Sequence, residues 1–97
     1  MRLVLHREVE TDVDAIMQYY KRVGSRGLAE DFYAELRRYM LIAAERPESF
    51  SIRERDLRRV NLDRFPYHFL FRVVGDAVRI LVVRHHRRHH SLGIYRR

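Results

Sequence analysis

Residues 66–88, PYHFLFRVVGDAVRILVVRHHRR, decide the fold because they predict a β-hairpin that continues into a basic, histidine-rich tail. Both arms are rich in aromatic and β-branched residues, which favour strands. Gly75 and Asp76 separate the arms, and a glycine in the first turn position suits a two-residue type II′ turn. Such a short turn fixes the register of the two strands. The expected cross-strand partners are Val74 with Ala77, Phe71 with Ile80, and His68 with Val83.

The two faces of this hairpin should differ, because side chains alternate along a strand. One face is almost entirely apolar and is expected to pack on the core. The other face is mixed and places Arg72 directly across from Arg79. Like charges in cross-strand positions repel each other, so this face should be open to water or to an anion. Its polar members are expected to be Arg59, Asn61, His68, Arg72, Arg79 and His85.

The residues before the hairpin predict a strand, two helices and another strand. Residues 2–6 alternate as a short strand does. Residues 9–20 and 28–43 then carry apolar stripes at helical spacing. Ser25 is a suitable cap for the second helix, and Pro47 should end that helix near residue 45.

The segment between the second helix and the hairpin divides into two parts. Residues 48–56 are polar and lack periodicity, which indicates a loop. Residues 57–62 predict the strand that precedes the hairpin. The order is therefore β-α-α-β-β-β, an α+β fold in which an antiparallel sheet carries a helical hairpin on one face. At 97 residues, the chain is expected to be a single domain covering residues 1–97.

Composition limits the functional classes. No apolar run approaches the ~18 residues of a membrane helix, and no cysteine is present, so a cytoplasmic location without membrane contact is expected. Residues 1–56 hold ten Lys and Arg against eleven Asp and Glu, a net of −1, whereas residues 57–97 hold ten Arg against two Asp, a net of +8. This concentration of positive charge favours a polyanionic or acidic protein partner.

The mixed hairpin face is the first candidate for chemistry. Its arginines could hold phosphates, and a histidine could exchange a proton near neutral pH. Such a combination can cleave RNA by activating a 2′-hydroxyl, or it can serve binding alone. The structural alternative is a solvated sheet face.

The C-terminal tail is the second candidate. Residues 84–90 are RHHRRHH, and the pairs His85/His89 and His86/His90 would suit zinc if the segment were helical. No neighbouring carboxylate or cysteine completes such a site, so no metal is expected and contact with phosphate or an acidic partner is favoured. Tyr95 could stack on a base or cover the end of the core. Phosphate-binding glycine loops and nucleophile motifs are absent from the sequence, so no cofactor is expected.

The order and spacing of these motifs resemble one family. The run LRRVNLDRFPYHFLFRVVGDAVRILVVRHHRR at 57–88, preceded by IMQYY at 16–20 and LAEDFYAELRRYM at 28–40, is similar to the RelE/ParE toxins of type II toxin–antitoxin modules. This group is also called the plasmid stabilization proteins. The resemblance covers nearly the whole chain and implies the β-α-α-β-β-β fold. It also implies a cognate antitoxin whose acidic C-terminal segment wraps the toxin.

The family resemblance leaves three functional hypotheses. The first is a metal-independent endoribonuclease that cleaves mRNA on the ribosome, as RelE-like members do. The second is a non-enzymatic inhibitor of DNA gyrase, as ParE-like members are. The third is an inactive member that binds only its antitoxin. Under the first, favoured hypothesis, the catalytic residues would be Arg59, His68, His85, Arg88 and Tyr95. The substrate-binding residues would be Arg58, Arg72, Arg79, Arg84 and Arg87.

Two positions depart from the nuclease pattern. Asn61 stands where that branch usually has a lysine, and His68 stands where it usually has an arginine. The gyrase-inhibiting branch often has histidines like His68 and His85. The resemblance thus leaves the choice between RNA cleavage and gyrase inhibition open.

Overall fold

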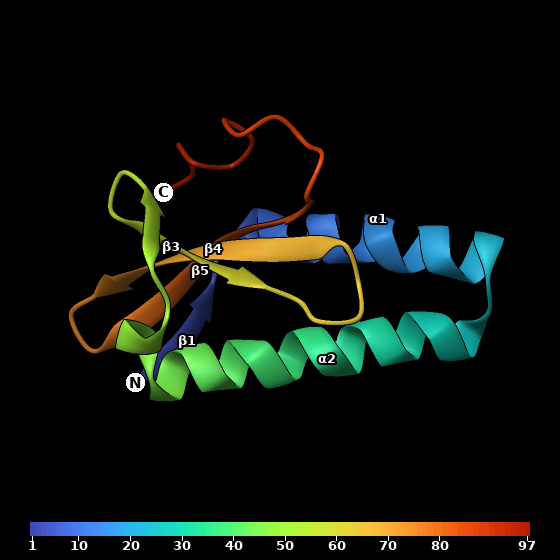
Figure 1. The fold of residues 1–97 in the computed structure, drawn as a ribbon, viewed down its shortest axis with the longest axis horizontal. Coiled ribbons are helices and arrows are strands. Elements are labelled where there is room, and N and C mark those ends of the chain that lie inside the picture. The colour runs from blue at the N-terminus through green and yellow to red at the C-terminus, as the bar shows by residue number, and fades with distance from the viewer.

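The computed structural model describes residues 1–97 and shows two helices packed against a five-stranded sheet (Figure 1). The sheet has the strand order β1-β5-β4-β3-β2. The elements are β1 (Arg2–Leu5), α1 (Arg7–Val23), α2 (Arg26–Glu45), the 3-10 turn η1 (Pro47–Ser49), β2 (Ile52–Glu54), β3 (Leu57–Asn61), β4 (Tyr67–Val74) and β5 (Ala77–His85). The predicted α+β class with a helical hairpin on one sheet face is confirmed. No helix has both the length and the apolar character needed to cross a membrane.

Both helices begin at capping side chains. The Nδ1 atom of His6 accepts a hydrogen bond from the Glu8 N–H at 3.1 Å, and the Ser25 hydroxyl accepts one from the Leu28 N–H at 3.0 Å. These bonds satisfy N–H groups that have no partner within a helix. Helix α2 ends at Glu45, two residues before Pro47, as that proline predicts.

The main core lies between the helices and the sheet. The predicted apolar stripes of both helices face it, and Phe69 and Phe71 of β4 are fully buried there. At one end of this core, aromatic rings from four segments meet at centroid distances of 5.3–6.1 Å, mostly edge to face. The rings belong to Tyr20, Phe32, Phe65 and Tyr67. Such ring pairs stabilise the core beyond the contribution from burying their apolar area.

The sheet differs from the expected one at both edges. Strand β1 pairs in parallel with β5, so the sheet is mixed rather than wholly antiparallel. Strand β2 lies within residues 48–56, where a loop was predicted. It pairs with β3 through a tight turn in which Arg55 has φ of 55°. The loop prediction was wrong here because an exposed edge strand needs no apolar periodicity.

The hairpin turn follows the prediction, but the register changes further along. Gly75 has φ of 59° while Asp76 does not have a positive φ, as a type II′ turn requires. The pairs Val74–Ala77 and Phe71–Ile80 form as expected. Beyond them, Leu70 pairs with Val82, so Leu81 is an extra residue in β5, a β-bulge. The predicted pairing of His68 with Val83 is therefore wrong, because His68 pairs with Arg84.

Because of the bulge, the residues of β5 after Leu81 lie on the sheet faces opposite to those predicted. Val83 joins the main core, and His85 pairs with Tyr67 on the helix side, with the two rings 5.1 Å apart. Arg84 instead shares the opposite face with His68. The predicted common face for His68 and His85 therefore does not exist.

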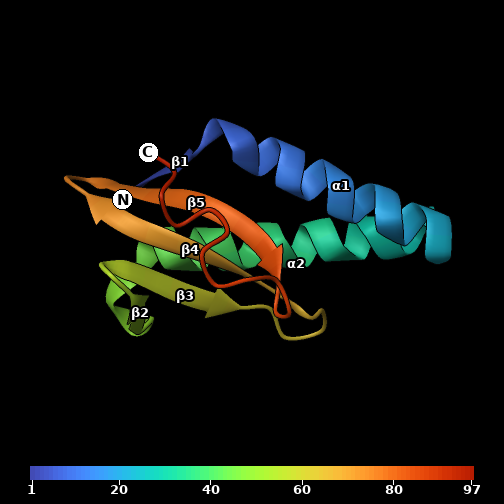
Figure 2. The same cartoon turned by 90° about the horizontal axis from the view of Figure 1, so that it is seen from above.

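The C-terminal segment, residues 86–97, covers the sheet face opposite the helices. Figure 2 shows it crossing β4 and β5, with α2 behind the sheet. Its Ile94 completes a second small core with Leu57, Leu70, Leu81 and Val82. Gly93, at φ of 83°, passes so close that an added Cβ would lie 2.4 Å from the Val82 Cβ. The sheet is thus buried on both faces over its centre.

Candidate functional site

His68 is the centre of a polar network beneath the C-terminal segment. Its side chain is only 1% exposed. Its Nε2 atom lies 2.9 Å from Arg84 Nε, and its Nδ1 atom lies 2.9 Å from His86 Nδ1. The His68 and His86 rings meet edge to edge through this contact, with centroids 5.2 Å apart and planes at 10°. This His68–Arg84–His86 network joins β4, β5 and the start of the C-terminal segment.

The hydrogen-bond partners determine the tautomers in this network. A guanidinium can only donate, so Arg84 Nε donates to His68 Nε2. Neutral His68 then carries its proton on Nδ1 and donates it to His86 Nδ1. Neutral His86 in turn carries its proton on Nε2. A second proton on either ring would place two donors against each other.

Arg84 attaches the C-terminal segment to the sheet. Its side chain is 2% exposed. Its Nη1 atom donates to the carbonyl oxygens of His90 and Leu92, each at 2.7 Å. Its Nη2 atom donates to Glu54 Oε1 at 3.2 Å, across the sheet on β2. Every nitrogen of the guanidinium is therefore used within the fold, and Arg84 is not free to hold a substrate phosphate.

The electrostatic environment keeps His68 neutral. Burial lowers the pKa of His68 to about 3, with further lowering from the positive charges of Arg59 and Arg84 and from the neighbouring histidines. Burial, together with Arg59 and His85, also lowers the pKa of His86. A general acid must be protonated near the working pH. His68 does not meet this requirement at neutral pH.

Arg59 is the cation at the open edge of the network. Its Nε donates to Asn61 Oδ1 at 2.8 Å, and its Nη2 lies 3.4 Å from His86 Nδ1. No carboxylate forms an ion pair with it. Burial and the charges of Arg84 and Arg53 lower its pKa, which shows that positive charge is concentrated here.

The strand registers do place Arg59, His68, Arg72 and Arg79 on the sheet face opposite the helices, as predicted. The prediction that they form one wet surface together with His85 was wrong. The C-terminal segment buries His68, and the bulge turns His85 to the other side. Arg72 is held by Asp56 through two hydrogen bonds of 3.0 and 3.1 Å. Arg79 lies in a separate cleft near the β1 edge. The residues thus belong to different environments rather than to one site.

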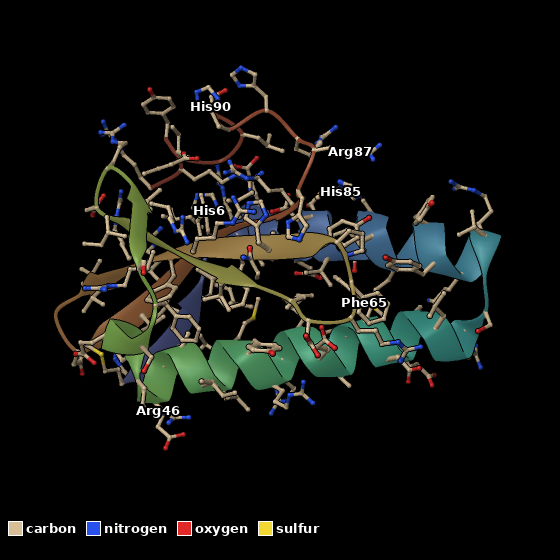
Figure 3. All side chains as sticks on the ribbon, in the orientation of Figure 1. His6, Arg46, Phe65, His85, Arg87 and His90 are labelled. Atoms are coloured by element: carbon tan, nitrogen blue, oxygen red, sulfur yellow. The ribbon has the colours of Figure 1, made fainter.

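His85 and Arg88 lie together where the C-terminal segment borders α1. They line a cleft of about 500 Å³ with Tyr19 and Tyr67. Figure 3 shows His85 at the end of β5 and Arg87 on the turn beyond it, extending away from the sheet.

The histidine pairs of the tail were considered as zinc ligands. No group of three or more His, Cys, Asp or Glu side chains is arranged to hold a metal ion.

The remaining candidates are also dispersed. Arg58 lies on the helix side of β3 and donates to the Phe50 carbonyl at 2.7 Å. Tyr95 is 71% exposed, with the Arg55 guanidinium 5.0 Å from its ring centroid. Tyr95 therefore does not cover the core; the preceding residue, Ile94, covers the second small core instead. Sequence reasoning missed the structural roles of Glu54 and His86. Neither position carries a local signal, because both depend on contacts across the sheet.

The family model described as the ParE toxin of the type II toxin–antitoxin system parDE matches residues 3–90.

This chain belongs to the ParE toxin family.

A solved structure titled "Chromosomal ParDE TA system from P. aeruginosa" has the same fold. Its TM-score is 0.78 at 23% sequence identity, and the match covers 88% of this chain and 95% of the other. No curated protein matches the chain significantly. The predicted resemblance to RelE/ParE toxins is confirmed. The matched branch is ParE rather than the RNA-cleaving RelE branch that the sequence favoured, so the predicted endoribonuclease activity is not supported.

Proposed function

We propose that this ParE-family toxin stops growth by binding and inhibiting DNA gyrase, without cleaving RNA. Membership of the ParE family supports the gyrase target. The observation that argues against RNA cleavage is the state of His68, which is buried, neutral and bonded on both ring nitrogens. A nuclease of the type first considered needs an accessible acid–base group beside free phosphate-binding cations. Neither His68 nor Arg84 is free for such a role.

The exposed cations offer a surface for binding instead. Arg53, Arg87 and Arg88 are exposed and form no ion pair, and Arg55 lies against the exposed ring of Tyr95. Arginine and tyrosine are enriched where proteins bind one another tightly. The net charge of +8 over residues 57–97 would also speed association with an acidic partner.

The same charge supports an acidic antitoxin segment as the neutralising partner. An apolar cleft of about 390 Å³ between β1, α1 and α2 is available to its apolar side chains. The cleft is lined by Leu3, Leu5, Val9, Val13, Met17, Tyr33, Leu36 and Met40, with Glu10, Asp14 and Arg37. An amphipathic helix of the antitoxin would suit this groove.

A supercoiling assay tests the proposed target. Purified toxin added to gyrase and relaxed plasmid should reduce supercoiling in proportion to its concentration, and prior addition of the antitoxin should restore it. Primer extension on translated mRNA from the same expressing cells should show no new 5′ ends. Full supercoiling at excess toxin, together with mRNA cuts that disappear in Arg88→Ala, would establish the nuclease instead. Expression without any effect on growth would leave antitoxin binding as the remaining function.

A further inference from the structure

A polar cleft lies at the β1 edge of the sheet face that the C-terminal segment covers. It has a volume of about 500 Å³ and no apolar side chain lines it. Three separate segments form it: the start of α1, the middle of β5 and the last residues of the chain. The lining residues are His6, Arg7, Glu8, Arg79, Arg96 and Arg97.

The cleft carries positive charge that the fold does not neutralise. Four of its six residues are arginines and one is a glutamate. Arg96 is paired with Asp12 at 2.7 Å and approaches Glu8 at 3.5 Å. Arg7, Arg79 and Arg97 take part in no ion pair. Three guanidinium groups around one small space are therefore without a counter-charge.

Arg79 shows that an acceptor is missing. Its Nε atom is buried and has no hydrogen-bond partner. Its cross-strand neighbour Arg72, by contrast, is satisfied by both oxygens of Asp56. A buried donor without a partner is costly, and more so when it is charged. An anion in the cleft would provide the acceptor that Arg79 lacks.

We propose that this cleft binds a phosphate group. The arginines approach from three segments, and a tetrahedral phosphate presents oxygens in several directions, whereas a carboxylate offers two in one plane. His6 adds a fourth donor, because its Nδ1 atom accepts from the Glu8 N–H and the neutral ring then carries its proton on Nε2. Free phosphate and the phosphodiester of a nucleic acid share this chemistry.

His6 also provides a spectroscopic reporter of binding. Burial lowers its pKa, and Arg96, Arg79 and Arg7 lower it further, while Glu8 acts in the opposite direction. A bound dianion would oppose the arginine charges and raise this pKa. The assignment of the cleft is independent of the gyrase proposal, since it rests on different residues.

The experiment is a titration of the full chain in chloride buffer at constant ionic strength. Inorganic phosphate is added in the first arm, a short DNA duplex in the second and a glutamate-rich peptide in the third. Binding is measured by calorimetry, and the pKa of His6 is measured by NMR. The test variant is Arg79→Gln. Arg72→Gln is the matched control, because it removes the same charge from the cross-strand neighbour outside the cleft. Arg97→Gln, at an exposed position, is a second test variant that should not disturb folding.

We expect phosphate to bind the wild type and to raise the pKa of His6. Arg79→Gln and Arg97→Gln should weaken binding at least about tenfold, whereas Arg72→Gln should not. Binding of the duplex but not of free phosphate, with the same dependence on Arg79, would identify nucleic acid as the source. Absence of binding in the first two arms would overturn the proposal. An equal loss of phosphate affinity in the Arg79 and Arg72 variants would also overturn the proposal. So would Arg79-dependent binding of a glutamate-rich peptide that is tighter than the binding of phosphate.

Discussion

Replacing Arg84 by methionine should release the C-terminal segment and destabilise the fold. The substitution keeps an unbranched side chain of similar length but removes every contact of the guanidinium. The Glu54 carboxylate would remain partly buried without its cation, and the carbonyls of His90 and Leu92 would lose their donor. Breaking a buried pair by removing one partner typically costs about 3–5 kcal/mol. That is a large part of the roughly 5–15 kcal/mol that stabilises a domain of this size.

Urea unfolding followed by circular dichroism measures this effect. Arg72→Met is the control, because the Arg72–Asp56 pair is more exposed and should contribute only about 0–1 kcal/mol. Adding Glu54→Gln to Arg84→Met should recover part of the loss, since it removes the unpaired carboxylate. If Arg84→Met lowers the free energy of unfolding no more than Arg72→Met does, the attachment of the tail through Arg84 is refuted.

Three further predictions concern the covered sheet face. Because the folded-state pKa of His68 lies below its usual 6.5, the unfolded state takes up more protons, and stability falls as the pH drops from about 6.5 toward about 3. The loss should be about 2 kcal/mol between pH 7.5 and pH 5, and unfolding curves of His68→Gln should lack it; an unchanged pH dependence would contradict the assignment. Gly93→Ala should cost about 1–3 kcal/mol, because its Cβ would collide with Val82 and its φ is positive. Thermal melts would measure this, and a neutral effect would mean that the segment does not pack closely. Ile94→Ala should cost about 2–4 kcal/mol and expose amides of β4 to hydrogen exchange, whereas the exposed Tyr95→Ala should change neither.

The sequence predicted those parts of the fold that depend on local signals. Ser25 and Pro47 mark the limits of α2 through backbone chemistry that acts within a few residues. The apolar stripes identify the buried helix faces, and Gly75 determines the hairpin turn. Each of these features follows from neighbouring residues, so no knowledge of distant contacts was needed.

The bulge at Leu81 could not be found in this way. Residues 80–83 are ILVV, four apolar side chains in succession, and such a run fits either register equally well. With both faces of the sheet buried, alternation carries no information about which residue is extra. The error placed His85 beside His68 and created the apparent catalytic face. Strand β2 was missed because an exposed edge strand needs no apolar periodicity, although its partner β3 follows directly in the sequence. The cover by Ile94 was missed because its packing partners lie far away in the sequence.

The most direct test of the central claim, that the His68–Arg84–His86 network is structural and not catalytic, is the growth arrest caused by His68→Gln. Glutamine can accept from Arg84 and donate to His86 but cannot exchange a proton near neutral pH. Folding of the variant would be verified by circular dichroism and by binding to the antitoxin. We predict that the folded variant arrests growth as strongly as the wild type. A folded, antitoxin-binding variant that no longer arrests growth would contradict the account.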